Sequence, residues 1–234
     1  MSNRSTEFAG QTMQLHPSGA LFWRGTSTLI LGDLHLEKAS SYHRSGQFLP
    51  PYDTAQTLAN LAAVCDDLRP DRLILLGDVF HDGNAWARMS SENRDRLIAI
   101  LDGRDTVWVE GNHDQSFVPP GHTGQLEWAD HGIIMRHIMD AAETRPEISA
   151  HFHPSATISL RGTRLRRPCF IQTATRLLLP SFGVLTGGLD CRDAALSPLH
   201  GRDTQVFMLG EDNVFAPPPG LTSQAVGGLK SGGW

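Results

Sequence analysis

Short apolar runs recur along the chain, and each is followed by glycine or by polar residues. Three of them, at residues 29–31, 72–76 and 106–109, are rich in leucine, isoleucine and valine, which is typical of buried β-strands. Apolar residues at helical spacing fill the two intervals between these runs, after Asp53 and after Ser90. Both residues are good N-caps, so we expect helices to begin there. The alternation predicts two parallel βαβ crossovers in the first half of the chain.

The segments around these elements have other patterns. Residues 1–10 are mostly polar, and we expect them to be frayed. Residues 13–16 and 20–23 flank a Pro-Ser-Gly turn, which predicts a β-hairpin at one edge of the sheet. Residues 37–47 are polar and predict a connection between the first strand and the first helix.

Short β-like runs dominate the chain after residue 114. They lie at residues 126–128, 132–136, 148–151, 156–160, 169–172, 176–179 and 205–209. A chain that begins βαβα and finishes with strands predicts an α/β fold, in which a two-sheet β-sandwich is flanked by helices. The last residues are rich in Pro, Gly and Ser, so we expect one domain over residues 1–216 and a disordered tail over residues 217–234.

The composition is that of an ordinary soluble globular protein. The chain has 234 residues, of which 40% are hydrophobic and 19% charged, and its formal net charge is −5. This charge gives no general attraction for nucleic acid, so binding to a phosphate backbone would depend on a local basic patch or on bound cations. The three cysteines form no C-x-x-C pair, and no apolar stretch approaches a membrane span. We therefore expect a cytoplasmic protein with reduced thiols.

Candidate metal ligands stand at the carboxyl ends of five strand-like runs. In open α/β sheets, ligands bind at that end of the strands. Aspartate and histidine supply the anionic oxygen and imidazole nitrogen atoms that suit divalent transition metals. Their recurrence after five runs predicts a shared metal site. In chain order these residues are Asp33, His35, Asp78, Asn112, His137, His151 and His153, and His113 and Asp114 directly follow Asn112.

The order of these residues resembles that of the calcineurin-like metallophosphoesterases. That family carries D-x-H, GD, GNHD, a single His and an H-x-H block in this order, and the resemblance covers residues 29–154. It implies two divalent ions, with Mn²⁺ expected and Zn²⁺ or Fe as alternatives. Such ions bind phosphate and lower the pKa of a water that attacks phosphorus. The ligands would be Asp33, His35, Asp78 and His153 for one ion, and Asp78, Asn112, His137 and His151 for the other.

The same resemblance implies roles in catalysis for two further histidines. It implies that His113 protonates the leaving oxygen and that His81 contacts the substrate. The single histidine of the fourth block has two neighbours, His122 and His131, as alternatives. We favour His137 because it ends an apolar run, whereas His131 precedes one.

One block departs from the family pattern. Ala150 precedes the H-x-H pair, at a position where the family normally has glycine. Alanine loses the ready access of glycine to positive φ. The substitution therefore raises a question about the local backbone angle more than about the ligands.

A finer resemblance is to the bacterial ligase-associated DNA damage response endonucleases. It rests on LHLEKASSY from Leu34, LPPYDT from Leu49, GDVFHD from Gly77, LRGTRLRRPCF from Leu160 and LPSFGVLTGGL from Leu179. The G-D-x-F-H form is shared with the nuclease subunit of the double-strand-break repair complex. Protein phosphatases of the same family carry Asp at the position of His81, so the sequence disfavours a protein phosphatase. The resemblance implies a manganese-dependent phosphodiesterase and endonuclease that acts on single-stranded or nicked DNA. It also implies a role in DNA repair, associated with a ligase, a helicase and an exonuclease.

Basic residues near these blocks are candidates for substrate binding. They are Lys38, His43, Arg44, Arg164, Arg166 and Arg167. They could hold phosphates next to the bond that is cut, and the arginines are equally compatible with a solvated strand edge. Two other functions stay open, namely hydrolysis of small nucleotides by the same site and a non-catalytic scaffold of the same fold. The sequence also leaves a homo-oligomer open.

Overall fold

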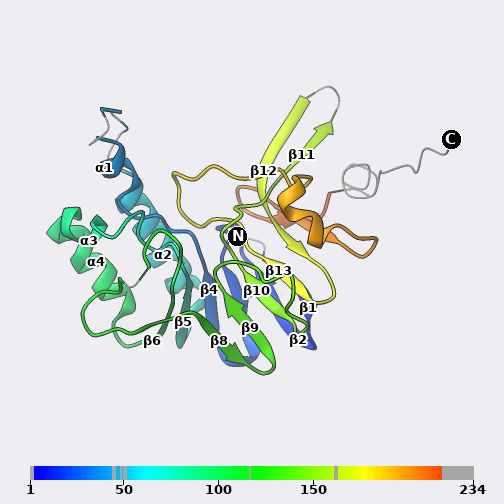
Figure 1. Ribbon diagram of the computed structural model, residues 1–234, viewed down its shortest axis with the longest axis horizontal. Coiled ribbons are helices and arrows are strands. Elements are labelled where there is room, and N and C mark those ends of the chain that lie inside the picture. Colours follow the sequence, from blue (N-terminus) through cyan, green and yellow to red (C-terminus); the bar gives the residue numbers. More distant parts are fainter. Residues whose placement is uncertain are drawn as a thin grey trace.

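The structure, a computed structural model, consists of two β-sheets packed face to face, with α-helices on the outer side of the first sheet (Figure 1). This confirms the predicted α/β sandwich flanked by helices. The structure describes residues 3–43, 46–47, 49, 52–115, 117–160 and 163–217. The predicted disordered tail lies outside these residues apart from Pro217, and Arg44 also lies outside them.

The first sheet is parallel at its centre. In spatial order its strands are β1 (Arg4–Phe8), β2 (Gln11–Leu15), β3 (Leu21–Trp23), β4 (Thr28–Leu31), β5 (Arg72–Leu76), β6 (Asp105–Val109) and β7 (Gly124–Gln125). The three predicted apolar runs are β4, β5 and β6, and they pair in parallel. The predicted hairpin is β2 and β3, which pair antiparallel. The first half of the chain therefore has the predicted βαβ crossovers.

The second sheet is formed by the later strands. In spatial order they are β15 (Val214–Phe215), β14 (Gln205–Leu209), β12 (Thr163–Gln172), β13 (Arg176–Leu178), β10 (Glu147–Ser149), β9 (Ile133–Arg136) and β8 (Glu127–Asp130), and β11 (Ser155–Leu160) pairs with β12. Strands β9 and β10 run parallel to each other. Their carboxyl ends therefore lie at the same edge of the sheet.

The helices occupy the connections. They are α1 (Lys38–His43), α2 (Asp53–Leu68), α3 (Ala85–Arg88) and α4 (Ser91–Leu101), with short 3₁₀ helices η1 (Arg24–Thr26) and η2 (Ala194–Leu199). Ser90 caps α4 as predicted, because its side chain accepts from the backbone N–H of Asn93 at 3.2 Å. No helix in the described part of the chain is long and apolar enough to cross a membrane.

The central strands contribute to two separate cores. Leu29 and Leu73 pack in the core beneath the helices, which also contains Leu61 of α2. Ile30 and Ile74, which point the other way, pack in the core between the two sheets. Because successive side chains of a strand face opposite sides, burial on both faces requires an unbroken apolar run. This is why these strands are continuous apolar segments in the sequence.

Residues 4–8 form a regular strand, contrary to the fraying predicted for this segment. Residues 4–8 form β1, which pairs antiparallel with β2, so β1 rather than the hairpin is the edge of the sheet. Phe8 is buried between the sheets, and the Thr6 hydroxyl donates to Gln172 Oε1 at 3.0 Å. The contact to Gln172 is a long-range one, which the polar composition of this segment does not indicate.

The segment between β4 and α2 also differs from its prediction. Its first part is α1 and not an irregular connection. Asp53 begins α2 but does not cap it, because the N-cap residue is Tyr52 and its side chain makes no cap hydrogen bond. The Asp53 carboxylate instead accepts from the backbone N–H of Ala39 at 2.9 Å. A tertiary contact between the two helices therefore replaces the local cap.

Candidate metal centre

The predicted ligands converge where the carboxyl ends of the parallel strands of both sheets meet. Asp33 and Asp78 follow β4 and β5, and Asn112 follows β6. From the second sheet, His137 follows β9 and His151 follows β10. Residues from five strands thus meet in one place, as the sequence pattern predicts.

Several of these residues have a left-handed backbone conformation. The angle φ is 56° at Asp33, 46° at His35, 50° at Asp78, 71° at His151 and 45° at His153. Such a conformation costs a non-glycine residue about 1–3 kcal/mol and persists only where the surrounding structure holds it. Strain of this kind concentrates at functional sites. Its presence at five predicted ligands marks this edge of the sandwich as the site.

Asp33, His35 and His153 form the first group of ligand atoms. His153 Nε2 lies 3.1 Å from Asp33 Oδ1 and 3.4 Å from His35 Nε2. His153 Nδ1 donates to the carbonyl oxygen of Gly187 at 3.1 Å, so in the neutral ring Nε2 presents its lone pair. Asp33 Oδ1 is buried and has no hydrogen-bond partner among the described residues. Two electron-rich atoms thus face each other, and a cation between them would satisfy both.

The second group surrounds His137. The Nδ1 atom of His137 donates to the carbonyl oxygen of Leu76 at 2.8 Å, which leaves Nε2 as an acceptor in the neutral ring. This Nε2 lies 3.1 Å from Asn112 Oδ1 and 3.2 Å from His151 Nδ1. It also lies 3.3 Å from Asp78 Oδ2. The second group therefore repeats the arrangement of the first.

Asp78 faces both groups. Its Oδ2 atom is 3.3 Å from His137 Nε2 and 3.8 Å from His35 Nε2. Its Oδ1 atom accepts from the backbone N–H of His113 at 2.9 Å, which fixes the orientation of the carboxylate. A carboxylate between two sets of imidazole nitrogens can serve two cations at once. Asp78 is therefore within 4 Å of an imidazole nitrogen of each group.

Burial and the contact between Asp78 and His137 set the charges in the centre. Burial opposes ionisation of Asp78, but the hydrogen bond and charge of His137, the backbone N–H of His113 and the charge of His35 together outweigh it and lower the pKa of Asp78 to about 2. At His137 burial is likewise outweighed, by Asp78, the charge of Asp33 and the carbonyl oxygen of Leu76 together, and the pKa of His137 is raised. Burial lowers the pKa of His35 to about 3 and also lowers the pKa of His151. At neutral pH Asp78 is therefore ionised and His35 is neutral, the states in which these side chains bind metals.

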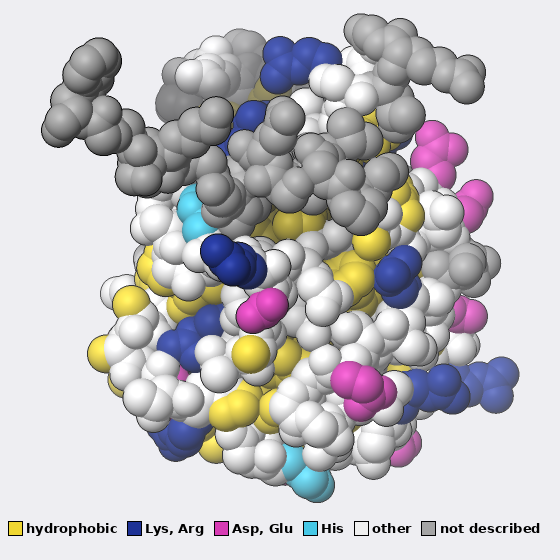
Figure 2. Space-filling view, turned by 90° about the vertical axis from the view of Figure 1, so that its right-hand side faces the viewer, with side chains coloured by type: hydrophobic (Ala, Val, Ile, Leu, Met, Phe, Trp, Pro, Cys, Tyr) yellow, Lys and Arg dark blue, Asp and Glu magenta, His cyan; other side chains and the backbone are white. Residues whose placement is uncertain are grey.

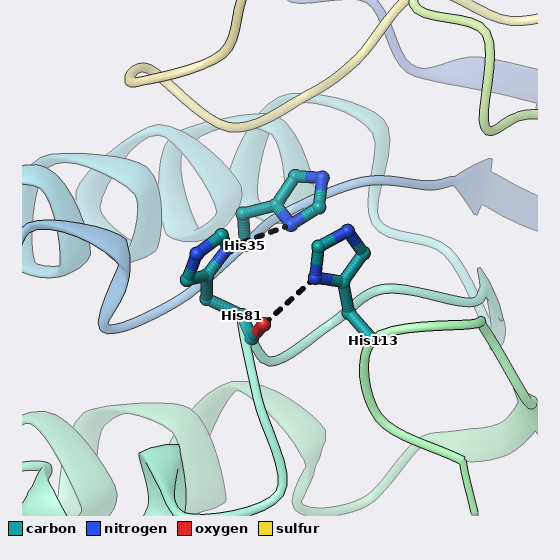
Figure 3. A group of neighbouring side chains, drawn as sticks. All are labelled: His35, His81 and His113. Atoms are coloured by element: carbon teal, nitrogen blue, oxygen red, sulfur yellow. Dashed lines mark hydrogen bonds between the residues drawn. The ribbon is translucent and has the colours of Figure 1, made fainter. Parts of the chain in front are cut away.

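His35, His81 and His113 form a third cluster beside the first group (Figure 3). His81 Nδ1 lies 3.5 Å from His35 Nδ1, and the rings of His81 and His113 stack with centroids 5.1 Å apart. His113 Nδ1 donates to the carbonyl oxygen of His81 at 2.9 Å, and its Nε2 lies 4.0 Å from Asp78 Oδ2. The His113 side chain is 40% exposed. It therefore reaches both the centre and solvent, as a proton donor to a leaving group requires.

Ala150 fits the site without the glycine that the family normally carries. The left-handed conformation belongs to the next residue, His151, and Ala150 itself has no positive φ. The backbone N–H of Ala150 donates to the carbonyl oxygen of His137 at 3.0 Å. Its methyl group lies against Gly32, where an added Cβ would be only 2.6 Å away. The alanine thus fills the space that Gly32 leaves, and the ligands keep their positions.

Asp114 is a site residue for which the sequence suggests no role of its own. Its Oδ1 accepts from the backbone N–H groups of Asp78 at 3.2 Å and Gly111 at 3.1 Å, and its Oδ2 accepts from that of Phe80 at 3.1 Å. The side chain is 3% exposed. Asp114 therefore joins the loops after β5 and β6, and so positions Asp78 and Asn112. The only sequence signal is its place at the end of the GNHD block.

A loop after β13, residues 181–188, encloses the first group and was also not assigned a role from the sequence. The Ser181 hydroxyl and the backbone N–H of Gly183 both donate to the carbonyl oxygen of Asp33, at 3.1 Å and 3.0 Å. Gly187 accepts from His153 Nδ1. An added Cβ at Gly183 would lie 2.3 Å from the carbonyl oxygen of Leu34, so glycine is required by this close approach. The signal in the sequence is the small-residue character of the LPSFGVLTGGL segment.

The alternatives to His137 lie away from the centre. The His131 ring packs against Trp23 with centroids 5.3 Å apart and its Nδ1 contacts Asp130 at 2.7 Å. The His122 ring packs against Trp108 with centroids 5.4 Å apart. His137 is therefore the one of the three that joins the other candidate ligands.

The predicted substrate-binding residues fall on two elements. Lys38 begins α1 and is half-buried, and burial lowers its pKa although Asp33 favours the charged form. His43 ends α1, and its side chain lies outside the description of the structure. On β12, Arg164 and Arg166 are exposed and Arg167 is half-buried.

Comparison with known proteins supplies the family. The model of the calcineurin-like phosphoesterases matches residues 26–165, which is more than half of the chain. The chain belongs to this family. It is therefore a metal-dependent phosphoesterase, and its histidine and aspartate clusters could hold the divalent metals that the family uses. Among curated proteins no sequence matches this chain.

Among solved structures, the nuclease MPE of Pseudomonas putida is similar to this phosphoesterase. The TM-score is 0.70, the sequences are 24% identical, and the match covers 92% of this chain and 100% of that chain. At this level of identity the likeness establishes the fold. The fold described above is thus shared over nearly the whole described chain.

The residues of the centre fit two divalent ions, because each group brings imidazole nitrogen and carboxylate oxygen atoms within 4.8 Å of one another. His137, whose pKa is raised, would release its proton when an ion binds. When bound, two such ions polarise phosphoryl oxygens and activate water at neutral pH. The chain itself orients the imidazoles through backbone carbonyls and holds a side chain, His113, that can carry a proton at Nε2 toward the leaving oxygen.

Proposed function

We propose that this phosphoesterase hydrolyses phosphodiester bonds in DNA with two metal ions. The observation that carries the proposal is the pair of ligand groups that face each other across Asp78. A phosphodiester needs charge neutralisation on its oxygens together with an activated water, and a two-ion site suits both needs. The nuclease to which the fold is similar supports a nucleic acid as the substrate.

The ions and the catalytic side chains have the following proposed roles. Mn²⁺ is the expected metal, with Zn²⁺ or Fe as alternatives. Asp33, His35, Asp78 and His153 bind one ion, and Asp78, Asn112, His137 and His151 bind the other. His113 protonates the leaving oxygen, since its Nδ1 is held by a carbonyl and its Nε2 faces the centre. His81, whose ring lies beside those of His35 and His113, contacts the substrate.

Basic residues hold the DNA on both sides of the centre in this proposal. Lys38 belongs to one side, and Arg164, Arg166 and Arg167 to the other. His43 and Arg44, which follow Lys38 in the sequence, are further candidates for the same role. The substrate is single-stranded or nicked DNA, because a strand must leave its duplex to bring one phosphate to a recessed centre. The sequence resemblance further suggests a cytoplasmic repair enzyme that works with a ligase, a helicase and an exonuclease.

A second candidate is the hydrolysis of small nucleotides. The observation that favours it is the net charge of −5, which repels a long polyanion more than a small one. A non-catalytic scaffold is a weaker candidate, because every predicted ligand is present and all lie together at the centre.

The proposal is tested with metal-free protein to which Mn²⁺, Zn²⁺, Mg²⁺ or Fe²⁺ is added. Each form is assayed on a chromogenic phosphodiester, a chromogenic phosphomonoester and circular single-stranded DNA. A circle has no ends, so its conversion to linear product reports endonuclease action. We expect Mn²⁺ to support cleavage of the diester and of the circle. An enzyme that leaves the circle intact with every metal while it hydrolyses a nucleotide would contradict DNA as the substrate.

A further inference from the structure

Strands β11 and β12 form an arm that projects from the second sheet (Figure 1). Their pairing runs antiparallel from Ser155 opposite Pro168 to Leu160 opposite Thr163. Only the last part of β12, from Cys169 onward, pairs with β14 in the sheet. The arm begins directly after His153 and Pro154, so its base lies at the metal centre.

The two faces of the arm differ. Ile158 is buried, and it and Leu165 contribute to an apolar cluster on the outer side of the second sheet. On the other face, Arg164 stands opposite Ser159 and Arg166 stands opposite Thr157. This second face is polar, and both of its arginines are exposed. We call it the basic face of the arm.

The charge of the arm is not balanced by acidic residues within it. Residues 155–172 contain four arginines and no Asp or Glu, although the whole chain carries −5. The acidic residues near the arm come from other segments of the described chain: Asp190 interacts with Arg166, and Glu211 and Asp212 line a hollow with Arg167. Figure 2 shows basic side chains at the upper end of the molecule, where the arm lies, and acidic ones mainly lower and at the right margin. The arm is therefore a local cationic surface.

Arg166 connects the basic face to the first ligand group. Its Nε donates to the Ser155 hydroxyl at 2.9 Å, and its Nη2 donates to the carbonyl oxygen of Gly188. Gly188 packs so closely on His153 that an added Cβ would lie 2.2 Å from the His153 carbonyl oxygen. The guanidinium of Arg166 thus binds Gly188, and Gly188 in turn packs against the candidate metal ligand His153.

A cavity of about 210 Å³ lies between the arm and the loop of residues 181–188. Its lining includes His153, Ser155, Arg166, Arg167, Ser181 and Thr186. The hydroxyls of Ser155, Ser181 and Thr186 already donate to backbone carbonyl oxygens. The donors that the cavity offers to phosphate oxygens are therefore the guanidinium groups of Arg166 and Arg167. One wall of the cavity is a predicted metal ligand, so an anion inside it would lie next to the phosphate that is cut.

We propose that this cavity and the basic face of the arm bind backbone phosphates of a single DNA strand on the His153 side of the bond that is cut. The proposal rests on the proposed function and deepens it, since it assigns the part of the DNA that each surface holds. Arg166 and Arg167 serve the phosphate next to the cut. Arg164 lies two residues before Arg166 in β12, toward the tip of the arm and about 7 Å away. It binds a more distant phosphate. Short substrates do not reach Arg164.

The test uses Arg164→Gln, because Arg164 is exposed and, unlike Arg166, holds no loop in place. Arg202→Gln is the matched control, an exposed arginine in the turn before β14. Mn²⁺-loaded enzymes are compared on a dinucleotide and on a long single-stranded oligonucleotide over a range of salt concentrations. For Arg164→Gln we expect KM for the long oligonucleotide to rise about tenfold, as for loss of a charge-assisted hydrogen bond. The effect on the dinucleotide is expected to be several times smaller.

Two further measurements separate charge from structure. The slope of log KM against log salt for the long oligonucleotide is expected to fall by about 0.7 in Arg164→Gln, one phosphate contact on a single strand. Arg164→Lys, which keeps the charge, is expected to restore most of that slope. Equal losses on the dinucleotide and the long oligonucleotide would overturn the assignment, as would behaviour identical to Arg202→Gln.

Failure of this proposal differs from failure of the proposed function. Binding of a fluorescent oligonucleotide is measured by anisotropy in the cold on the same proteins, so that cleavage is not needed. If the wild-type enzyme cuts no DNA but binds the oligonucleotide less tightly after Arg164→Gln, the proposed reaction is wrong and the proposed phosphate subsite is supported. If the wild-type enzyme cuts DNA and Arg164→Gln binds it as tightly as Arg202→Gln, the subsite is wrong and the reaction stands.

Discussion

At the scale of single residues, three histidines of the centre are oriented in the same way but differ in how exposed they are. The Nδ1 atoms of His137, His153 and His113 all donate to backbone carbonyl oxygens, so each ring directs Nε2 inward. His137 and His153 are 3% and 18% exposed, whereas His113 is 40% exposed. A shielded Nε2 among carboxylate oxygens is suited to a metal. An Nε2 that reaches solvent is suited to exchange a proton.

This difference predicts the behaviour of His113→Ala. The variant should keep both metal ions, because no ligand is removed. Its kcat should fall by about 10²–10⁴-fold on a substrate with an alkoxide leaving group, and much less on one with a nitrophenolate, which needs no proton. Steady-state kinetics on the two substrates, with metal content determined for each preparation, give the answer. Equal losses on both substrates, or loss of metal, would remove the role of proton donor.

His81 leads to a different expectation. It contacts His35 and His113 and is not needed to complete either ligand group. We expect His81→Ala to retain both metals and to lose at least tenfold more activity on DNA than on a small chromogenic diester. The physical reason is that a DNA strand must be steered to bring one phosphate to the centre, whereas a small ester diffuses in. A parallel decrease on the two substrates would show that His81 acts on the chemistry and not on the strand.

At the scale of elements, the loops after the parallel strands are held by contacts between loops. Asp114 is the clearest case, because one buried carboxylate accepts from three backbone N–H groups of two loops. Burial raises the pKa of Asp114, and the bonds from Phe80 and Gly111 oppose that rise. Both carboxylate oxygens of Asp114 accept hydrogen bonds, so a side-chain amide, which has one acceptor oxygen and one donor nitrogen, cannot replace them.

Asp114→Asn should therefore be destabilising. The amide has one acceptor oxygen, so at least one buried N–H group loses its partner, at a cost of about 1–3 kcal/mol in the free energy of unfolding. We also expect weaker metal binding, because the backbone that carries Asp78 is loosened. Urea unfolding and metal titration of the variant test both points. Asp203→Asn, at an exposed position in the turn before β14, is the matched control, and stability equal to that control would contradict the role of Asp114.

The loop that carries His81 is tied to α1 by Arg88. Its guanidinium donates to both oxygens of Asp82 at 2.7 Å and to the Ser40 hydroxyl at 3.2 Å. The hydrogen bond from Arg88 lowers the pKa of Asp82 against the opposing effect of burial. A carboxylate with a lowered folded-state pKa stabilises the fold above its ordinary pKa of about 3.9. That stability is lost as the pH falls through the lowered value.

We therefore expect the stability difference between the wild type and Arg88→Gln to depend on pH. At neutral pH the wild type should be more stable by less than about 1 kcal/mol, since the pair is partly exposed. The difference should shrink once the pH falls below the ordinary and then the lowered pKa of Asp82, to the part that comes from the contacts of Arg88 with Ser40 and Glu37. Urea unfolding over a pH series measures it, with Arg202→Gln as a charge-matched control. A difference that stays constant from neutral to acid pH would refute the contribution of the pair.

At the scale of the whole molecule, the sequence predicts correctly those elements whose buried side chains form a pattern within one short segment of the sequence. Strands β4, β5 and β6 are buried on both faces, so they stand out as apolar runs, and their ends carry the ligands. What the sequence did not predict depends on distant partners. β1 is held through Thr6 and Gln172, and Asp53 serves Ala39 instead of capping its helix. Asp114 likewise shows its function only when two loops meet.

The candidate ligands come from both sheets, so bound metal should join the two halves of the sandwich. Asp78 belongs to the first sheet, whereas His137 and His151 belong to the second. In metal-free protein, Asp78 and His137 are in contact at 3.3 Å, but no cation holds the remaining ligand atoms of the two sheets together. Metal binding should therefore stabilise the folded chain as a whole, and not only its active site.

Removal of metal should lower the midpoint of thermal unfolding. An ion at one hundred times its Kd adds about 2.7 kcal/mol, which for a chain of this size corresponds to roughly 5–10 °C. Return of Mn²⁺ should restore the midpoint in a concentration-dependent way. Asp78→Asn should lose most of this gain, because a neutral amide bridges two cations poorly, whereas Asp203→Asn should keep it. An Asp78→Asn protein that gains as much stability from Mn²⁺ as the wild type, and holds two ions, would show that Asp78 is not the shared ligand.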